Sequence, residues 1–209
     1  MGFNKIQKIK QIKFAKKGNI MWLLLLFFGF LIIIVFIVRS KVQDAYLEKY
    51  QFPETVIAKF KEKHKTLTDA DIELVQEGLR KYFYISSHSS DIVIMPSVVV
   101  DDLWHEFILY SKEYNSFCRQ AFGRFLHHSP NDTKTFDVDM ARFLAWEKSC
   151  KLEGLNPFTT SELPSIFKID EQFNIKNGLY YSVSKERYWY RRYYEKLEEE
   201  RANSCGSCG

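Results

Sequence analysis

The chain has 209 residues, of which 46% are hydrophobic and 16% aromatic, with only 9 glycines and 5 prolines. This composition excludes a disordered or collagen-like chain, because it supplies enough apolar surface to form a core. Four cysteines are too few for a small fold held together by disulfides. The net charge of +4 hides an asymmetry, since residues 1–20 carry six lysines and no acidic residue. The remainder holds 24 basic and 26 acidic residues, so the charge does not indicate a nucleic-acid-binding surface.

Residues 21–38, MWLLLLFFGFLIIIVFIV, form an uninterrupted apolar segment. As a helix these residues would extend about 27 Å, close to the hydrocarbon thickness of a bilayer. A core helix of a soluble protein would have a polar face, and a cleaved signal peptide would be shorter and would end at a small-residue site. The segment therefore predicts a single transmembrane helix that acts as an uncleaved signal anchor, with the lipid bilayer as its partner.

The lysines on either side of this segment predict its orientation. Six lysines lie in the basic N-terminal flank, residues 1–20, whereas only Arg39, Lys41 and Lys49 follow the segment closely. Because positive residues stay on the cytoplasmic side, we expect a cytoplasmic N-terminus and an extracytoplasmic C-terminal domain. Isoleucines between the lysines also fit an amphipathic helix on anionic headgroups, although a solvated basic flank fits equally well.

Helical patterns dominate the rest of the chain, and they predict an all-α fold or nearly so. Residues 92–95 are a short strand candidate or a buried connector, and residues 155–182 are predicted to be mainly loop. The single transmembrane helix is thus followed by one compact helical domain with long loops. The predicted segments are a basic flank at 1–20, the transmembrane helix at 21–38, a charged helical connector at 39–66, the helical domain at 67–202 and a flexible Cys/Gly tail at 203–209.

The clearest start of a helix is Thr68, which can cap the helix together with Asp71 at the third helical position. Apolar residues at helical spacing extend this helix to about Tyr84. Ser97 is a second candidate cap, and Gly154 is expected to end the helix predicted over residues 135–151. The helices predicted after the first cover residues 98–118, 135–151 and 184–200.

The residues best suited to chemistry lie between Asp101 and His128. On a helix, Asp101 and Asp102 precede His105 by four and three residues, so either carboxylate shares a face with this imidazole. Such a carboxylate serves metal ligation and general-base catalysis alike. His127 and His128 would join the site if their loop folds back. Three histidines and Asp101 suit a divalent metal such as zinc, or a harder ion with more carboxylate character.

The same segment resembles the glycine-rich-domain-containing protein family through Asp101-x-x-Trp104-His105, followed by Tyr114 and Cys118. The bacterial members are also similar at the Met-Pro-Ser of residues 95–97, the Phe-x-His-His of residues 125–128 and the Cys/Gly tail. The resemblance covers about residues 70–170 and implies a shared domain without a reaction to carry over. Plant members often have a second histidine where Phe107 stands here, which argues against a simple two-histidine metal site.

The cysteines fit the candidate site poorly. Cys118 falls about 220° around a helix from His105, so we expect it in the core, and Cys150 likewise. Cys205 and Cys208 form a lone C-x-x-C in the tail. This motif lacks the two further ligands of a zinc site and the helix start of a thioredoxin-like site. We expect a flexible tail with reactive thiols, with a redox role as the alternative.

Residues 187–194, RYWYRRYY, mix basic and aromatic side chains, as single-stranded nucleic-acid platforms do. Glutamates at 186, 195 and 198–200 largely cancel this charge. An aromatic helix face that packs on the domain is therefore the favoured interpretation, and no nucleic-acid partner is expected.

Two functions follow from the sequence. The first is a single-pass membrane anchor that presents a helical interaction domain to a protein partner. The second is a metal-dependent enzyme or metal-binding module centred on Asp101, His105, His127 and His128. Geometry separates the two: imidazoles of His105 and of His127 or His128 within roughly 4–5 Å, with a converging carboxylate, favour a metal. Rings that point apart favour the interaction domain.

Overall fold

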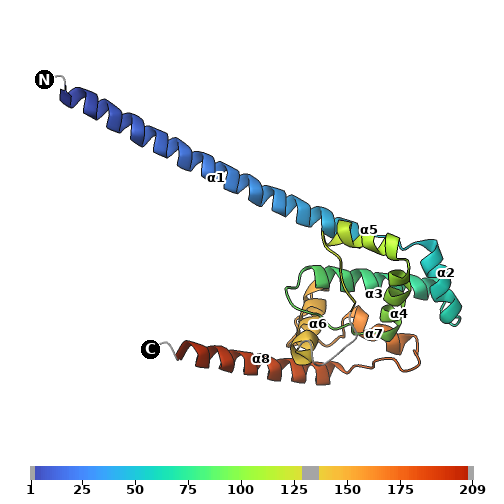
Figure 1. Ribbon diagram of the computed structural model, residues 1–209. Helices are drawn as coiled ribbons and strands as arrows, with labels where there is room; N and C mark the ends of the chain where they lie inside the picture. The colour runs from blue at the N-terminus through green and yellow to red at the C-terminus, as the bar shows by residue number, and fades with distance from the viewer. Residues whose placement is uncertain (1–2, 129–136, 207–209) are drawn as a thin grey trace. The chain divides into compact units, whose positions relative to one another are not determined.

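The computed structural model describes the backbone of residues 3–128 and 137–206, and the side chains of residues 25–128 and 137–203 (Figure 1). Within these ranges all regular secondary structure is α-helical, which confirms the predicted all-α class. The chain divides into two compact units, Met1–Ala45 and Tyr46–Gly209. The described helices are α1 (Phe3–Lys49), α2 (Glu54–Lys63), α3 (Asp69–Ser87), α4 (Val98–Leu109), α5 (Ser111–Ala121), α6 (Val138–Leu152), α7 (Ser165–Gln172) and α8 (Val183–Gly206).

The predicted apolar segment is helical throughout and lies within α1. The part from Leu25 to Lys49 contains a window with a mean hydropathy of 2.4, and no side chain in this window is buried. A core helix of a soluble protein would be largely buried. By length and composition, α1 is therefore able to cross a membrane.

The local signals at two helix ends act as predicted. The Thr68 hydroxyl accepts a hydrogen bond from the Asp71 backbone N–H at 3.2 Å, and the Thr68 N–H donates to the Asp71 carboxylate at 2.8 Å. This reciprocal capping box starts α3, which continues to Ser87. At the other end of the domain, α6 stops at Leu152, and Gly154 takes up a φ of +71°, which glycine adopts without strain. Asp137 caps the start of α6, and the predicted start at residue 135 lies outside the described residues.

The helix predicted over residues 98–118 is interrupted at Tyr110, and this prediction was wrong. Ser97 caps α4 as expected, but Tyr110 leaves helical geometry with a ψ of 65° and α5 begins at Ser111. In one straight helix, Phe107 and Phe117 would be about 15 Å apart along the axis. The bend instead brings their ring centroids to 5.3 Å, so both rings are buried in the same cluster.

The structure decides one open alternative and adds one helix. Residues 92–95 form the connector and not the strand, and the Ile94 N–H donates to the Ala141 carbonyl at 3.3 Å. The region 155–182 is mainly loop, as predicted, but it also contains helix α7, which was not predicted. This helix has only eight residues and follows Pro164, so its periodicity is too short to recognise, although it buries Ile166, Phe167 and Ile169.

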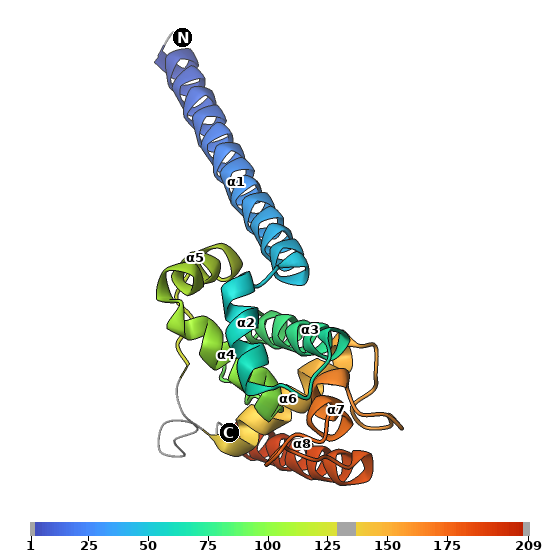
Figure 2. The same ribbon diagram turned by 90° about the vertical axis from the view of Figure 1, so that its right-hand side faces the viewer.

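Helix α4 is the central element of the second unit, where it packs against α2, α3, α5 and α7 (Figure 2). A Cβ atom at Gly78 of α3 would lie 2.8 Å from Ile169 Cδ1 and 3.0 Å from Val100 Cγ2. Glycine at this position therefore allows α3 to approach α4 and α7 closely. The close packing of α3 and α7 against Val100 fixes the first turn of α4, where Asp101 follows.

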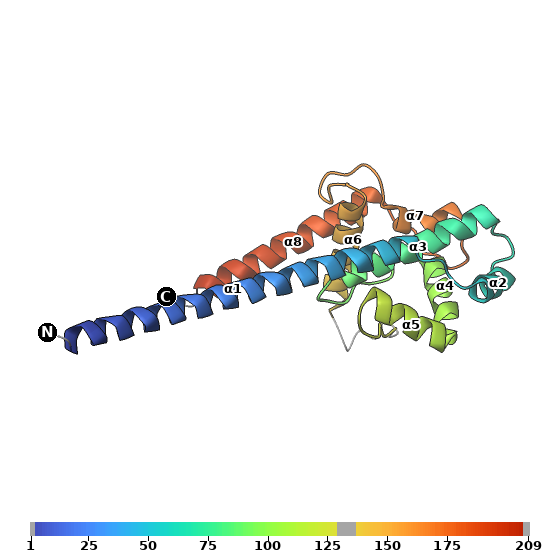
Figure 3. The ribbon, with the colours of Figure 1, turned by 90° about the horizontal axis from the view of Figure 1, so that it is seen from above.

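Helix α8 packs against α6 through its aromatic face, as expected (Figure 3). The rings of Tyr190 and Phe143 stack with centroids 4.7 Å apart, and Tyr193 is also buried. The Arg142 guanidinium donates three hydrogen bonds to the buried carboxylate of Glu186, at 2.7, 2.8 and 3.2 Å. Packing and ion pairing thus involve one face of α8.

Candidate metal centre

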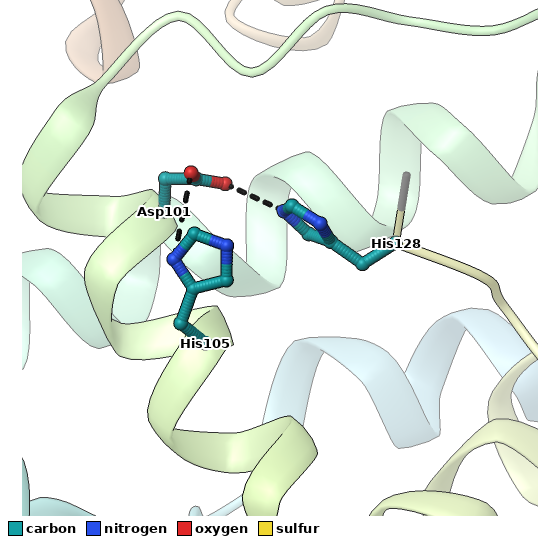
Figure 4. Close-up of side chains that lie close together, drawn as sticks. All are labelled: Asp101, His105 and His128. Atoms are coloured by element: carbon teal, nitrogen blue, oxygen red, sulfur yellow. Dashed lines mark hydrogen bonds and ion pairs between the residues drawn. The ribbon is translucent and has the colours of Figure 1, made fainter. Parts of the chain in front are cut away.

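Three of the predicted site residues converge on one point (Figure 4). Asp101 lies between His105, on the same helix α4, and His128, on the loop that follows α5. Its Oδ1 is 3.0 Å from His128 Nε2, and its Oδ2 is 3.7 Å from His105 Nδ1. The two imidazole centroids are 4.5 Å apart, and one ligand atom from each residue lies within 4.8 Å of the others.

Helix geometry and one loop contact position these side chains. Asp101 and His105 are four residues apart on α4, so they share a face as predicted. The Trp104 indole N–H donates to the Tyr114 hydroxyl at 3.1 Å, and that hydroxyl donates to the Leu126 carbonyl at 2.6 Å. The Trp104 ring also meets the edge of His128, with centroids 4.3 Å apart. The loop is thereby folded back onto α4.

The three side chains lie at the boundary between the core and the solvent. The exposed fraction is 17% for His128, 30% for Asp101 and 51% for His105. An ion held here would have protein ligands on its inner side and access to water on its outer side. A set of two or three histidines with a carboxylate and an open position is typical of catalytic zinc sites.

A second carboxylate–imidazole pair lies next to this triad, and sequence reasoning missed its histidine. Asp102 Oδ2 is 3.1 Å from Nε2 of His64, which follows the last residue of α2 and lies against the Phe60 ring. Burial raises the pKa of Asp102, with a further rise from the negative charge of Asp101, although His64 and His105 oppose this. No local spacing could have revealed His64, because the packing of α2 on α4 brings it to Asp102.

The other predicted site residues do not join the triad in the described part of the chain. His127 is exposed, and its ring contacts that of Phe125 at 4.8 Å. Cys118 and Cys150 are buried, as expected. Burial raises the pKa of the Cys118 thiol. It also raises the pKa of the Cys150 thiol, to about 12. Such thiols stay protonated and are poor metal ligands.

The two tail cysteines are described only in part. Cys205 lies in the last turn of α8, with its side chain outside the described residues, and Cys208 lies entirely outside them. Of the C-x-x-C motif in the tail, the structure describes the helical backbone at Cys205.

Fold and site together define a helical domain with a histidine–aspartate cluster on its central helix, preceded by an apolar N-terminal helix. Residues 42–206 match the UCP032817-like family, and the chain belongs to this family. The matched region includes every residue of the cluster and begins after the apolar segment of residues 21–38. Neither the curated proteins nor the solved structures gave a significant match.

Proposed function

We propose that this protein is a membrane-anchored helical domain that binds a divalent transition-metal ion, such as zinc, through Asp101, His105 and His128. The observation that carries the proposal is the convergence of two imidazoles and a carboxylate from two separate segments of the chain. The two ring centroids are 4.5 Å apart, and the Asp101 carboxylate contacts both rings (Figure 4). Imidazoles this close together, with a converging carboxylate, favour a metal site over an interaction domain, in which the rings would point apart.

The distances fit a shared ion. Zinc binds histidine nitrogen and carboxylate oxygen at about 2.0–2.2 Å, so two ligands of one ion lie roughly 3–4 Å apart. Each imidazole lies in this range from one oxygen of the Asp101 carboxylate. Oδ1 is 3.0 Å from His128 Nε2, and Oδ2 is 3.7 Å from His105 Nδ1. Three protein ligands leave a position for water, whose pKa a bound metal lowers. The site thus has the ligand set for metal-assisted hydrolysis.

The competing function is an interaction domain in which the same residues only hold the loop in place. The 3.0 Å contact between His128 and Asp101 would then be a structural hydrogen bond. The two functions differ in one measurable property, since only the metal centre retains zinc through these three side chains.

Zinc affinity of the full chain in detergent, measured by calorimetry against a competing chelator, tests the proposal. Cys205 and Cys208 are replaced by serine in every sample, so that the tail thiols contribute no zinc site. Asp101→Asn and His128→Phe should weaken zinc binding by more than the roughly 10–100-fold loss typical of outer-shell partners. His128→Phe retains a ring against Trp104.

The matched control is His127→Phe, the same substitution one residue earlier, at an exposed side chain outside the triad. This variant should bind zinc like the parent chain. If the parent binds no zinc, or if His128→Phe and Asp101→Asn bind it as tightly as the parent, the interaction domain is the better description.

The anchor and its orientation are part of the proposal. The exposed apolar window of α1 supports a membrane span, and the excess of lysines before it supports a cytoplasmic N-terminus with an extracytoplasmic domain. Alkaline phosphatase, which is active only outside the bacterial cytoplasm, is fused after Gly209. Activity is expected, together with retention in membranes after an alkaline wash. A stable but inactive fusion would place the domain in the cytoplasm, and release by the wash would indicate a cleaved signal sequence.

Kinship with the glycine-rich-domain-containing proteins also belongs to the proposal. Its support is that the motif residues Trp104, Tyr114 and Cys118 are all buried in one core cluster, where a shared domain would require them. A structure of a member of that family would test this: the same Trp–Tyr contact between two short helices is expected, and a different fold would refute it.

A further inference from the structure

Two acid–imidazole pairs lie side by side on α4. Asp101 is in contact with His105 and His128, while Asp102, the next residue, is in contact with His64. Among the described residues, Asp101, His105 and His128 form one convergent group. The pair of Asp102 and His64 lies outside that group. The histidines come from three different elements, the end of α2, helix α4 and the loop after α5. The packing of three separate elements therefore brings three imidazoles next to Asp101 and Asp102 of α4.

His64 and Asp102 are close enough for an ion pair, but their geometry is not that of a hydrogen bond. Nε2 of His64 is buried, lies 3.1 Å from Asp102 Oδ2 and makes no hydrogen bond. A buried imidazole nitrogen without a hydrogen bond favours a further partner, such as a metal ion. Two ligands that bind one zinc ion at about 2.0–2.2 Å lie roughly 3–4 Å apart, and their lone pairs point at the ion instead of at each other. The observed distance of 3.1 Å fits such a ligand pair.

The charges in this region also favour cations. Asp101 and Asp102 are adjacent carboxylates, and the three histidines are neutral when they act as ligands. Lys63, the neighbouring residue of His64, is already paired with the buried carboxylate of Glu106. Two carboxylates on consecutive residues therefore lack a lysine or arginine partner in the described ranges.

We infer that α4 carries a two-metal centre, in which His64 Nε2 and Asp102 Oδ2 hold a second divalent cation beside the ion at Asp101, His105 and His128. This inference rests on the proposed function, since the first ion is the one proposed above. Paired metal ions in hydrolytic sites are about 3.5–4 Å apart and commonly share a bridging oxygen ligand. Two protein ligands are few for an independent site, so the second ion binds after the first and more weakly.

The stoichiometry of bound zinc tests the inference. The full chain in detergent, with Cys205 and Cys208 replaced by serine, is dialysed against zinc and analysed for metal per chain. The parent should bind two zinc ions, with the second released first on dilution. His64→Phe retains a ring against Phe60 and removes the ligand nitrogen, and Asp102→Asn removes the charge with little change in shape. Each variant should bind one zinc ion, held as tightly as the tighter ion of the parent.

Controls separate this inference from the proposed function. His127→Phe should still bind two ions, because its imidazole lies outside both ligand sets. A parent that binds one ion, lost in His128→Phe and unchanged in His64→Phe, would overturn the second site and leave the first intact. A parent that binds none would overturn both. Asp102 is 42% exposed, so Asp102→Asn should fold even if His64→Phe does not, and two zinc ions in Asp102→Asn would also refute the second site.

Discussion

The indole of Trp104 and the hydroxyl of Tyr114 are joined by a buried hydrogen bond of 3.1 Å that links helix α4 to helix α5. The same hydroxyl donates to the Leu126 carbonyl at 2.6 Å, only two residues before His128. A single phenol oxygen thus connects the helix that carries Asp101 and His105 with the loop that carries His128. The motif residues Trp104 and Tyr114 therefore hold the loop that carries His128 against helix α4.

Tyr114→Phe should loosen the site without removing a ligand. The ring remains, but the Trp104 N–H and the Leu126 carbonyl both lose their partner, which should cost about 1–3 kcal/mol of unfolding free energy. Zinc affinity should fall as well, because the loop no longer holds His128 in place. Tyr110→Phe is the matched control, since its hydroxyl makes only an exposed 3.4 Å contact with the Thr55 carbonyl. Equal thermal stability and zinc affinity in the two variants would show that the Tyr114 hydroxyl positions nothing.

Local signals were sufficient for several parts of the fold and of the site. The Thr68 capping box involves only neighbours in sequence, and the helical spacing of Asp101 and His105 follows from the 3.6-residue period. The apolar run of residues 21–38 is recognisable from composition alone. Each of these features depends on residues within one helix, so no knowledge of the tertiary structure is needed.

Tertiary packing decides the features that sequence reasoning could not resolve. Neither glycine nor proline marks the break at Tyr110, which exists because Phe107 and Phe117 pack in one cluster. The choice of His128 over His127 depends on the hydrogen bond to the loop backbone at residue 126. His64 reaches Asp102 only because α2 packs on α4.

Trp104 and His105 are adjacent but should respond to truncation in opposite ways. Trp104 is 4% exposed and contacts the rings of Tyr82 and Phe83, so Trp104→Ala should cost about 3–5 kcal/mol. The His105 side chain is half exposed, so His105→Ala should change stability by less than about 0.5 kcal/mol. It should nevertheless weaken zinc binding. Thermal melts and zinc titrations of both variants check this, with Tyr188→Ala as an exposed aromatic control that should change neither.

The reverse pattern would identify His105 as a structural residue. A His105→Ala variant that melts several degrees lower and binds zinc like the parent would remove this imidazole from the ligand set. The proposed centre would then depend on Asp101 and His128 alone, and two protein ligands are too few for an independent zinc site.

Asp170 of α7 holds the first turn of α4 in place. Its buried carboxylate accepts hydrogen bonds from the Ser97 hydroxyl at 2.7 Å, from the backbone N–H groups of Val98 and Val99 at 2.7 and 3.2 Å, and from Leu179 N–H at 2.8 Å. A negative charge at this position also favours the positive end of the helix dipole.

Asp170→Asn should therefore destabilise the domain by about 1.5–3 kcal/mol, because an amide cannot accept all four hydrogen bonds. Glu171→Gln, the corresponding neutralisation at the exposed neighbouring residue, should cost less than about 0.5 kcal/mol. Denaturant or thermal unfolding of the full chain in detergent provides the comparison. Equal midpoints for the two variants would contradict the role assigned to the buried carboxylate.

Glu153 should make the stability of the domain depend on pH. Burial by itself would raise the pKa of Glu153, but hydrogen bonds from the Ser165 hydroxyl and N–H, together with Lys81 at 3.1 Å, outweigh it and hold the pKa below its ordinary value of 4.5. A carboxyl group whose pKa is lowered by folding stabilises the folded state above its unfolded pKa. This stabilisation is lost as the pH falls through the lower folded value.

Glu153→Gln should thus cost about 1.5–3 kcal/mol at pH 7, where the carboxylate is charged in both states of the parent chain. The difference between parent and variant should remain constant down to about pH 5 and shrink below the ordinary pKa of 4.5. Thermal melts between pH 7 and pH 3 check this, and taking the difference cancels the titration of the metal ligands. Glu162→Gln, at a 69% exposed carboxylate with a 3.7 Å contact to Lys168, should give a difference near zero throughout. A difference for Glu153→Gln that grows toward acid pH would mean that folding raises the pKa of this carboxyl group, and that burial outweighs its hydrogen bonds.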